Sequence, residues 1–395
     1  MFPLSDAPNP PRTPIVTYAL IAINVLVFVL VTLPMSAQAP SPADPRLAAY
    51  VSALREALPA NVPIREAIAS LSVYDLFVFE HGYKPGAPEW ADLVAAMFLH
   101  GGFMHLFGNM LFLWIYGDNV EYRLGRWRYL AAYLLTGVAA TLAFGLLAPD
   151  SRVPMVGASG AISGILGFYF LWFPSNVVRV LLLLFPFLVR IVEVPARIVL
   201  GIYLVLDNVV PILAAGGDGG GGVAHGAHIG GFVAGLAAAW LLSQRDVQST
   251  PREYRGEARA AAPAQGIVAQ ALRAGDPAAA ARAYFALSPR DAQSALEPQQ
   301  ALGLGEWLAA NGHAEAAVTI FHRYLRNQPH GPLAADAHVA AGRVLLRHLD
   351  QPTTAYQHFV AALRRNPSPD VAVEARAGLA AIASTQKLPA RRFVG

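Results

Sequence analysis

The chain contains no cysteine and few charged residues. Of its 395 residues, none is cysteine and 14% are charged. The lack of cysteine excludes disulfides, thiolate metal sites and a cysteine nucleophile. With 55% hydrophobic residues and a mean hydropathy of +0.41, the chain is too apolar on average for one soluble domain. The composition therefore indicates a membrane protein.

Charge is unevenly spread along the chain. The net charge is only +3, and the basic residues lie beside apolar runs rather than on a stripe with interleaved aromatics, so we expect no nucleic-acid partner. From about Gln244 onward, charges alternate with alanine and leucine. We predict a membrane domain over 1–243, a linker over 244–262 and a soluble helical repeat domain over 263–395, and hence an all-α fold.

Six apolar runs are long enough to cross a hydrocarbon core of roughly 30 Å. They are Ile15 to Leu33, Leu93 to Tyr116, Tyr129 to Ala148, Met155 to Phe173, Arg197 to Leu213 and Val223 to Leu242. The first could instead be a signal peptide cut near Ala37-Gln38-Ala39, but its length favours a retained span. Val180 to Val189 is too short to cross and is interpreted as interfacial or re-entrant.

Arginines predict the orientation. They follow the second span at Arg123, Arg126 and Arg128 and the sixth at Arg245. By the positive-inside rule, both termini are cytoplasmic. With six spans, Ser159 in the fourth and His228 in the sixth both start from the outer face, roughly 6 to 10 Å below the surface.

Ser159 and His228 are the candidate nucleophile and base. Ser159 lies in Gly157-Ala158-Ser159-Gly160, and His228 lies in Gly226-Ala227-His228-Ile229-Gly230-Gly231. Polar groups in a span are costly unless they face a cavity or a partner. Two G-x-x-x-G pairs, Gly160 with Gly164 and Gly231 with Gly235, would let these helices approach closely. Plain helix packing is the alternative explanation of the glycines.

His105 and Asn109 in the second span are candidate oxyanion donors. They are four residues apart and so share one helical face. Together with the backbone N–H of Ser159, they could stabilise a developing oxyanion. No buried acid is evident, which predicts a Ser-His dyad, and Asp207 is the residue most able to overturn that prediction.

A metal site is the alternative use of the histidines. His100, His105, His225 and His228 all lie at or near the outer half of the membrane. The same layer lacks a carboxylate to complete a typical hydrolytic zinc site. We therefore expect no metal and no cofactor, and we interpret His225 as a solvated or capping residue.

Four motifs resemble those of the rhomboid intramembrane serine proteases. They are H-G-G-F-M-H-L-F-G-N-M, G-D-N-V-E followed by R-L-G-R, G-A-S-G-A and A-H-I-G-G-F-V-A-G, and the resemblance covers roughly Pro14 to Leu242. It implies a six-span bundle that cuts transmembrane substrates without a cofactor. It also implies that Ser159 is the nucleophile, His228 the base, and His105 and Asn109 part of the oxyanion hole, with Gly157 in the same transition-state set.

Two positions depart from that family. Ser163 stands where some members have a bulky aromatic that stacks on the base, so other packing must hold the histidine. A Trp-Arg pair of the first long loop is replaced by Trp90-Ala91. The run Gly216 to Gly222, before His228, is expected to form a flexible outer cap, with a plain linker as the alternative.

The tail carries a repeated pattern. Ala281 to Phe285, Ala317 to Phe321 and Ala355 to Phe359 recur at intervals near the tetratricopeptide period of about 34. Each of these three segments is preceded by a turn signal and followed by a proline. This predicts stacked helical hairpins resembling tetratricopeptide repeats, able to bind a protein partner. A stabilising appendage without a partner is the alternative.

The sequence favours an intramembrane serine endopeptidase acting on transmembrane protein substrates in the lipid bilayer. We expect it in the bacterial inner membrane, with the site opening toward the outer face. The first alternative is an inactive rhomboid-like protein that binds membrane clients. A metal-dependent transporter is the second.

Overall fold

The computed structural model describes residues 2–57, 68–184, 188–214, 225–254 and 265–386. The chain divides near Ala239 into two compact units. Two short segments that precede this point, around Pro8 and Phe173, belong to the second unit. The first unit contains the apolar helices, and the second contains the helices of the tail. The predicted cap at Gly216 to Gly222 lies outside the described residues.

Among the described residues, four helices are long and apolar enough to cross a membrane. They are Ile15–Ser36, Arg126–Leu147, Ala196–Leu213 and His225–Gln248. The first comprises α1 (Ile15–Val27), a π-helical turn (Phe28–Thr32) and α2 (Leu33–Ser36), and the third comprises α10 (Ala196–Leu204), a π-helical turn (Val205–Val209) and α11 (Val210–Ala214). The second is α8 and the fourth is α12. These helices make the chain a membrane protein.

The second predicted span, Leu93 to Tyr116, needs a correction. It is broken into α6 (Asp92–Ala95) with a 3-10 turn (Ala96–Phe98), then α7 (Phe103–Leu124), bent by 95°. Two consecutive glycines, Gly101 and Gly102, stand in the break, where helix propensity is lowest. Counting the bent pair as one span gives up to five among the described residues.

The fourth predicted span is shorter than expected. Helix α9 (Ser159–Trp172) has 14 residues, which is about 21 Å at 1.5 Å per residue. It therefore falls short of the length needed to cross alone, and the count of six spans stays a prediction.

The expectation of an all-α fold also needs a correction. Strands β1 (Phe2–Ala7), β2 (Val177–Leu184) and β3 (Leu188–Pro195) form one sheet in the order β1-β2-β3. The segment interpreted as interfacial, Val180 to Val189, lies largely within β2 and β3. Valine and isoleucine, which favour strands, are frequent at the outer ends of β2 and β3, and a short apolar run does not by itself distinguish a strand from a helix.

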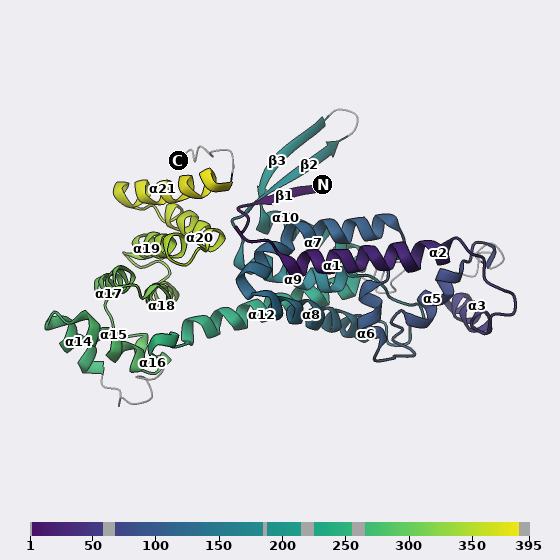
Figure 1. The fold of residues 1–395 in the computed structure, drawn as a ribbon, viewed down its shortest axis with the longest axis horizontal. Helices are drawn as coiled ribbons and strands as arrows, with labels where there is room; N and C mark the ends of the chain where they lie inside the picture. The colour runs from purple at the N-terminus through teal and green to yellow at the C-terminus, as the bar shows by residue number, and fades with distance from the viewer. Residues whose placement is uncertain (1, 58–67, 185–187, 215–224, 255–264, 387–395) are drawn as a thin grey trace. The chain divides into compact units, whose positions relative to one another are not determined.

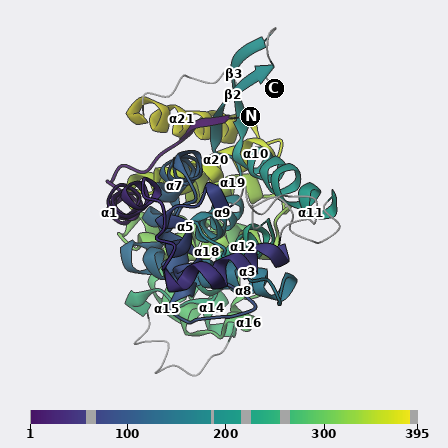
Figure 2. The ribbon, with the colours of Figure 1, turned by 90° about the vertical axis from the view of Figure 1, so that its right-hand side faces the viewer.

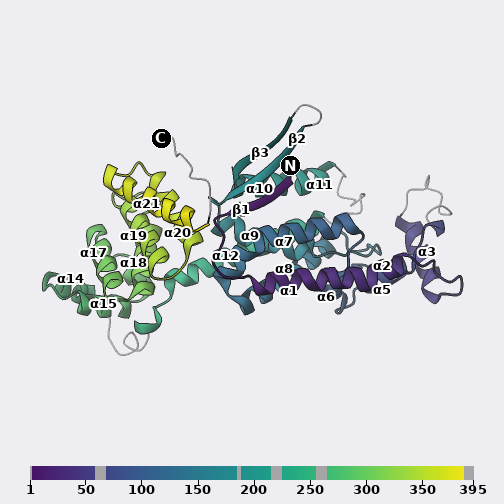
Figure 3. The ribbon, with the colours of Figure 1, turned by 45° about the horizontal axis from the view of Figure 1, so that its top comes forward.

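Helix α9 is the central helix of the first unit. It packs against α7, α8 and α10, and its glycines meet those of α12. Figure 1 and Figure 3 show α1, α7 and α8 running alongside it, and Figure 2 views the same bundle along its length. A residue at the start of α9 is therefore surrounded by several helices.

Glu121 near the end of α7 caps the start of α1. Its carboxylate accepts hydrogen bonds from the backbone N–H of Val16 at 2.9 Å and of Thr17 at 2.7 Å, and from the Thr17 hydroxyl at 2.8 Å. Helix α1 has no acidic residue in its own first turn. A carboxylate from another helix thus satisfies N–H groups that a helix start leaves unpaired.

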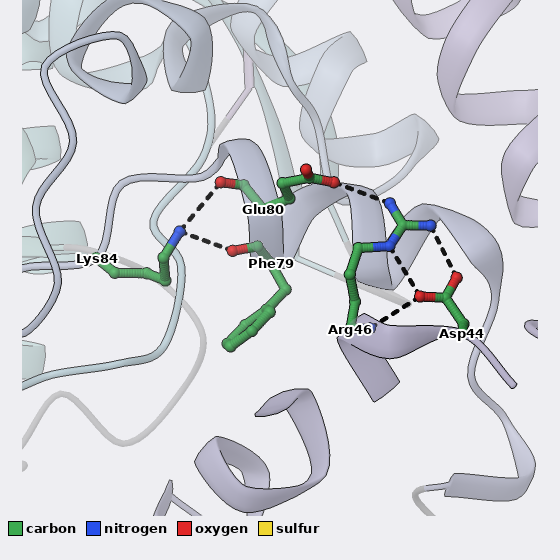
Figure 4. Close-up of polar contacts among 5 residues, drawn as sticks. All are labelled: Asp44, Arg46, Phe79, Glu80 and Lys84. Carbon is green, nitrogen blue, oxygen red and sulfur yellow. Dashed lines mark hydrogen bonds and ion pairs between the residues drawn. The ribbon is translucent and has the colours of Figure 1, made fainter. Parts of the chain in front are cut away.

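The segment between α2 and α6 contains α3 (Pro45–Ala57) and α5 (Val73–His81). In Figure 4 the Arg46 guanidinium lies between the carboxylates of Asp44 and Glu80, each 2.9 Å away. Its hydrogen bonds lower the pKa of Asp44 to about 2. These contacts tie the start of α3 to the end of α5.

Lys84 closes the end of α5. Its ammonium donates to the carbonyls of Phe79 at 2.7 Å, Glu80 at 3.2 Å and Gly82 at 3.0 Å (Figure 4 draws the first two), and lies 3.6 Å from Asp92. Cations suit the unpaired carbonyls at a helix C-terminus. The buried lysine therefore fixes the segment that leads into α6.

The described part of the tail is built from helices. They are α14 (Gln265–Arg273), α15 (Pro277–Ala286), α16 (Pro289–Ala292), α17 (Pro298–Ala310), α18 (Ala314–Asn327), α19 (Ala334–Arg347), α20 (Pro352–Leu363) and α21 (Pro369–Gln386). Consecutive helices pack on one another, for example α17 on α18 and α19 on α20. The predicted linker starts inside α12, which continues to Gln248, and a 3-10 turn (Arg252–Tyr254) follows.

The repeated alanine and phenylalanine positions form the core of the tail. Phe285, Phe321 and Phe359 lie on α15, α18 and α20 and are almost fully buried. Asp276 caps α15 by accepting from the Ala279 N–H at 2.9 Å. The predicted helical pairs are present, and their likeness to tetratricopeptide repeats stays a prediction.

Candidate active site

Ser159 is the first residue of α9, and the loop before it is held by backbone hydrogen bonds. Met155 pairs with Tyr83 through bonds of 2.8 and 3.1 Å, and the Gly157 N–H donates to the Ala96 carbonyl at 2.8 Å. These bonds involve only main-chain atoms, so they fix the path of the chain into the serine.

Gly157 has a specific steric role. Its φ of +122° is a conformation that L side chains rarely adopt, and a Cβ there would lie 2.7 Å from the His105 ring. Its N–H, engaged by Ala96, is not free to serve as an oxyanion donor. The missing side chain of Gly157 makes room for His105 beside the serine, and its place in the predicted transition-state set stays a prediction.

His228 stands one helical turn into the described part of α12, facing Ser159. Its Nε2 lies 2.7 Å from the Ser159 Oγ, within the reach that a nucleophile and its base require. Both residues are half-buried. The structure thus brings together two side chains 69 positions apart in the chain.

The glycine pairs let the two helices touch at the backbone. A Cβ on Gly231 would overlap the carbonyl oxygen of Gly160, and a Cβ on Gly235 would overlap that of Gly164. All four predicted glycines therefore lie at one contact between α9 and α12. Larger residues at these positions on α12 would push the helices apart and separate the serine from the histidine.

Asn208 is a polar neighbour of His228 that sequence reasoning missed. Its Oδ1 lies 2.7 Å from the His228 Nδ1, and its side chain is fully buried. The adjacent Asp207, considered from the sequence as a third member, is exposed. The sequence holds a signal for it, because Asn208 is a second polar residue in the same apolar run, but a neutral amide does not suggest a triad as an acid does.

Asn109 and His105 form the opposite wall. Asn109 is buried, and its Nδ2 has no hydrogen-bond partner in the part of the chain that the structure describes. That nitrogen lies 3.7 Å from where a Cβ of Gly157 would be. An unpaired buried donor is costly, and a ligand oxygen beside Ser159 would satisfy it.

One cavity joins these groups. It has a volume of about 790 Å³ and is lined by His105, Asn109, Gly157, Ser159 and His228, among others. Its size is within the range of ligand pockets, roughly 300 to 1,000 Å³. The predicted nucleophile, base and oxyanion donors therefore face a common space.

His100 and His225 each lie beside a histidine of the candidate site. The ring of His100 lies 5.2 Å from that of His105, and the ring of His225 lies 6.3 Å from that of His228. The described residues contain no group of three or more His, Cys, Asp or Glu able to hold a metal ion. Both ring nitrogens of His228 are engaged, by Ser159 and by Asn208.

The two departures noted in the sequence have clear positions. Ser163 is buried in α9, one turn after Ser159, and Trp90 is 86% exposed. Tyr203 of α10 also lines the cavity, with its ring 5.3 Å from that of Phe112. An aromatic side chain is thus contributed to the cavity by the fifth predicted span instead of the fourth.

Part of the chain is similar to proteins named as rhomboids. Residues 87–245 match the family model described as the Rhomboid domain. Over 161 residues, 40% of this chain and 54% of the relative, the chain is 34% identical to Rhomboid-like protein 11, chloroplastic, of Arabidopsis thaliana. It is 30% identical to Rhomboid-type serine protease 2 of Emericella nidulans, over 39% of this chain and 27% of that protein.

A third relative is Rhomboid protein 1, mitochondrial, of Saccharomyces cerevisiae. It is 30% identical over 42% of this chain and 46% of its own length. The chain thus spans about half or less of the length of these relatives. The matched region, residues 87–245, contains every candidate site residue named above.

Proposed function

We propose that this chain, which carries a rhomboid domain, is an intramembrane serine endopeptidase that cleaves transmembrane segments of membrane proteins. One observation carries the proposal: the Ser159 Oγ lies 2.7 Å from the His228 Nε2 on a cavity that Asn109 also lines. Nucleophile, base and an oxyanion donor around one space are what acyl transfer requires.

The geometry supports a stepwise mechanism. The Ser159 Oγ attacks the scissile carbonyl carbon while its proton passes to the His228 Nε2. The carbonyl oxygen becomes an oxyanion, which accepts hydrogen bonds from Asn109, His105 and the Ser159 N–H. The imidazolium then gives its proton to the leaving amine, and water repeats the sequence to release the acyl group.

The short α9 supports a site below the membrane surface. If its C-terminal end lies at the cytoplasmic face, its length of about 21 Å leaves roughly 9 Å of a 30 Å core above Ser159. Substrate must then enter the cavity within the bilayer. A transmembrane segment that unwinds locally would present its backbone there.

Loss of the nucleophile tests this function. The full-length protein, reconstituted in liposomes with a labelled transmembrane substrate, should cleave it, and Ser159→Ala and His228→Ala should each lower kcat at least about 10³-fold. Chelator should leave cleavage unchanged. Cleavage that survives Ser159→Ala would refute the mechanism.

The same assay separates the alternatives. A wild-type protein that binds the labelled segment but never cuts it would favour the client-binding protein. Activity lost with chelator, and indifferent to Ser159→Ala, would favour the metal-dependent transporter.

We further propose that both termini are cytoplasmic and that the site opens to the outer face, as the arginine distribution indicates. The relatives include a chloroplastic and a mitochondrial protein, so the bacterial inner membrane is part of the proposal. Because the chain has no cysteine, Trp90→Cys and Arg245→Cys give clean labelling sites. An impermeant maleimide should label the first from outside and the second only after permeabilisation; the reverse pattern would overturn the orientation.

A further inference from the structure

His228 is held on both sides of its ring. Its Nε2 faces Ser159 at 2.7 Å, and its Nδ1 faces the Asn208 Oδ1 at 2.7 Å. We propose that Asn208 is a positioning residue, which fixes the tautomer and orientation of His228 so that the site works as a Ser159–His228–Asn208 chain. This inference rests on the proposed function and extends it.

The orientation of the Asn208 amide follows from its other contact. Its Nδ2 donates to the Tyr203 carbonyl at 3.2 Å, and a carbonyl only accepts hydrogen bonds. The amide nitrogen must therefore face Tyr203, which leaves the amide oxygen facing His228. An amide oxygen only accepts, so the His228 Nδ1 must carry the proton.

This tautomer is the one that a general base needs. With the proton on Nδ1, the Nε2 lone pair points at the Ser159 hydroxyl and can take its proton. In the other tautomer, Nε2 would donate to the serine and could not activate it. Asn208 thus stabilises the reactive form of His228 without touching substrate.

The local backbone accounts for the position of Asn208. It lies in the π-helical turn Val205–Val209 between α10 and α11, a feature that is frequent at functional sites. Asn208 is fully buried while Asp207 is exposed. Asn208 itself is outside the cavity lining, so it reaches the site only through His228.

Ser163 explains why such a residue is needed here. It is buried one turn after Ser159, and a serine is too small to cover an imidazole ring. Beside the edge-on contact with the His225 ring, at 6.3 Å between centroids, the hydrogen bond to Nδ1 gives the His228 ring a directional restraint.

A neutral amide differs from the acid of a Ser-His-Asp triad. It fixes the tautomer but adds no negative charge to stabilise the imidazolium. Replacing Asn208 with aspartate should therefore keep the hydrogen bond and favour the protonated ring. The acidic limb of the pH–rate profile should then move to higher pH.

The test compares Asn208→Ala, Asn208→Asp and the matched neighbour Asp207→Ala in the full-length, reconstituted protein. We expect Asn208→Ala to lower kcat about 10- to 100-fold, the range typical of residues that orient a functional histidine, with KM changed less than about twofold. Asn208→Asp should retain activity above neutral pH, with its acidic limb shifted upward by about 1 unit or more. Asp207→Ala should match the wild type.

Labelling of Ser159 by a fluorophosphonate gives a readout that needs no peptide substrate. Asn208→Ala should be labelled about 10-fold more slowly than the wild type at an unchanged melting temperature, and Asn208→Asp should recover the rate at high pH. An Asn208→Ala variant that cleaves and labels like the wild type would overturn the role of Asn208 and leave the proposed function standing. An Asn208→Asp variant with an unshifted pH–rate profile would do the same. A wild type whose cleavage does not depend on Ser159 would overturn the proposed function with it.

Discussion

Glycine serves opposite purposes in the two units of this chain. In the membrane unit, Gly231 and Gly235 of α12 lie against the carbonyl oxygens of Gly160 and Gly164 of α9. In the tail, Gly305 lies against the ring of Phe321, and Gly342 lies against the ring of Phe359. The first contact joins two backbones, and the second seats a large side chain.

If the tail lies in water, as the sequence predicts, the solvent explains this difference. In lipid, burying an apolar side chain gains little, so helices associate through close backbone packing. In water, burial of an aromatic ring is strongly favourable, and a glycine opposite the ring provides its space. A backbone contact cannot relax without moving a helix, whereas a ring can turn or shift.

Among the tests of this difference between the units, the largest effect should come from Gly235→Ala. The added Cβ would overlap the Gly164 carbonyl and force α9 and α12 apart, and a displacement of about 1 Å at a catalytic pair can cost about 100-fold in rate. We expect cleavage of the labelled transmembrane substrate to fall by about that factor. Gly201→Ala is the control, because no atom lies within 4 Å of its added Cβ. A Gly235→Ala variant with more than half the wild-type rate would contradict the role of backbone contact.

A smaller effect should come from Gly305→Ala in the tail. Its Cβ would collide with the Phe321 ring, and overpacking a core typically costs about 1 to 3 kcal/mol. Gly303→Ala on the same helix meets no atom within 4 Å and should stabilise α17 by up to about 1 kcal/mol. Hydrogen exchange of α17 and α18 in the full-length protein measures both. Equal hydrogen exchange in Gly305→Ala and Gly303→Ala would contradict the claim that Gly305 makes room for the Phe321 ring.

The smallest effect should appear on mild acidification of the tail. Burial, with the nearby Arg365 and His322, lowers the pKa of His338 to about 3, and its Nδ1 lies 3.0 Å from that of His358. Because the folded pKa is below the unfolded value of about 6.5, the stabilisation is present above pH 6.5 and is lost as the pH falls. Between pH 7 and 6 the loss should be below about 1 kcal/mol, and by pH 5 it should reach roughly 2 kcal/mol.

Hydrogen exchange of α19, corrected for the intrinsic effect of pH, checks this expectation. His338→Asn should flatten the pH dependence, because asparagine does not titrate. Protection of α19 that is identical at pH 7 and 5 would show that the buried histidines do not couple to the stability of the tail.

Residues carried by short motifs were predictable, and residues placed by tertiary structure were not. Ser159 and His228 lie in distinctive glycine-rich motifs, and a polar residue in an apolar run is conspicuous. Asn208 has no such motif. Both Asp207 and Asn208 lie in the π-helical turn, and it is Asn208 that faces the histidine. Which of two adjacent polar residues faces the site depends on the helical register, and the composition of the run does not reveal it.

Secondary structure followed the same rule. The long apolar helices were predictable from length alone. The strands over Val177–Leu184 and Leu188–Pro195 were not, because a ten-residue apolar run fits several structures. The break before Phe103 was missed because Gly101 and Gly102 sit inside an otherwise apolar stretch, where glycine is often tolerated in membrane helices.

The cap that Glu121 places on α1 has a consequence for synthesis. Its bonds to Val16 and Thr17 join residues 105 and 104 positions apart, so α1 leaves the ribosome long before its cap exists. Until α7 has been made, the unpaired N–H groups of α1 must find water or lipid headgroups. The start of the first helix is therefore completed late, and its final placement depends on the arrival of α7.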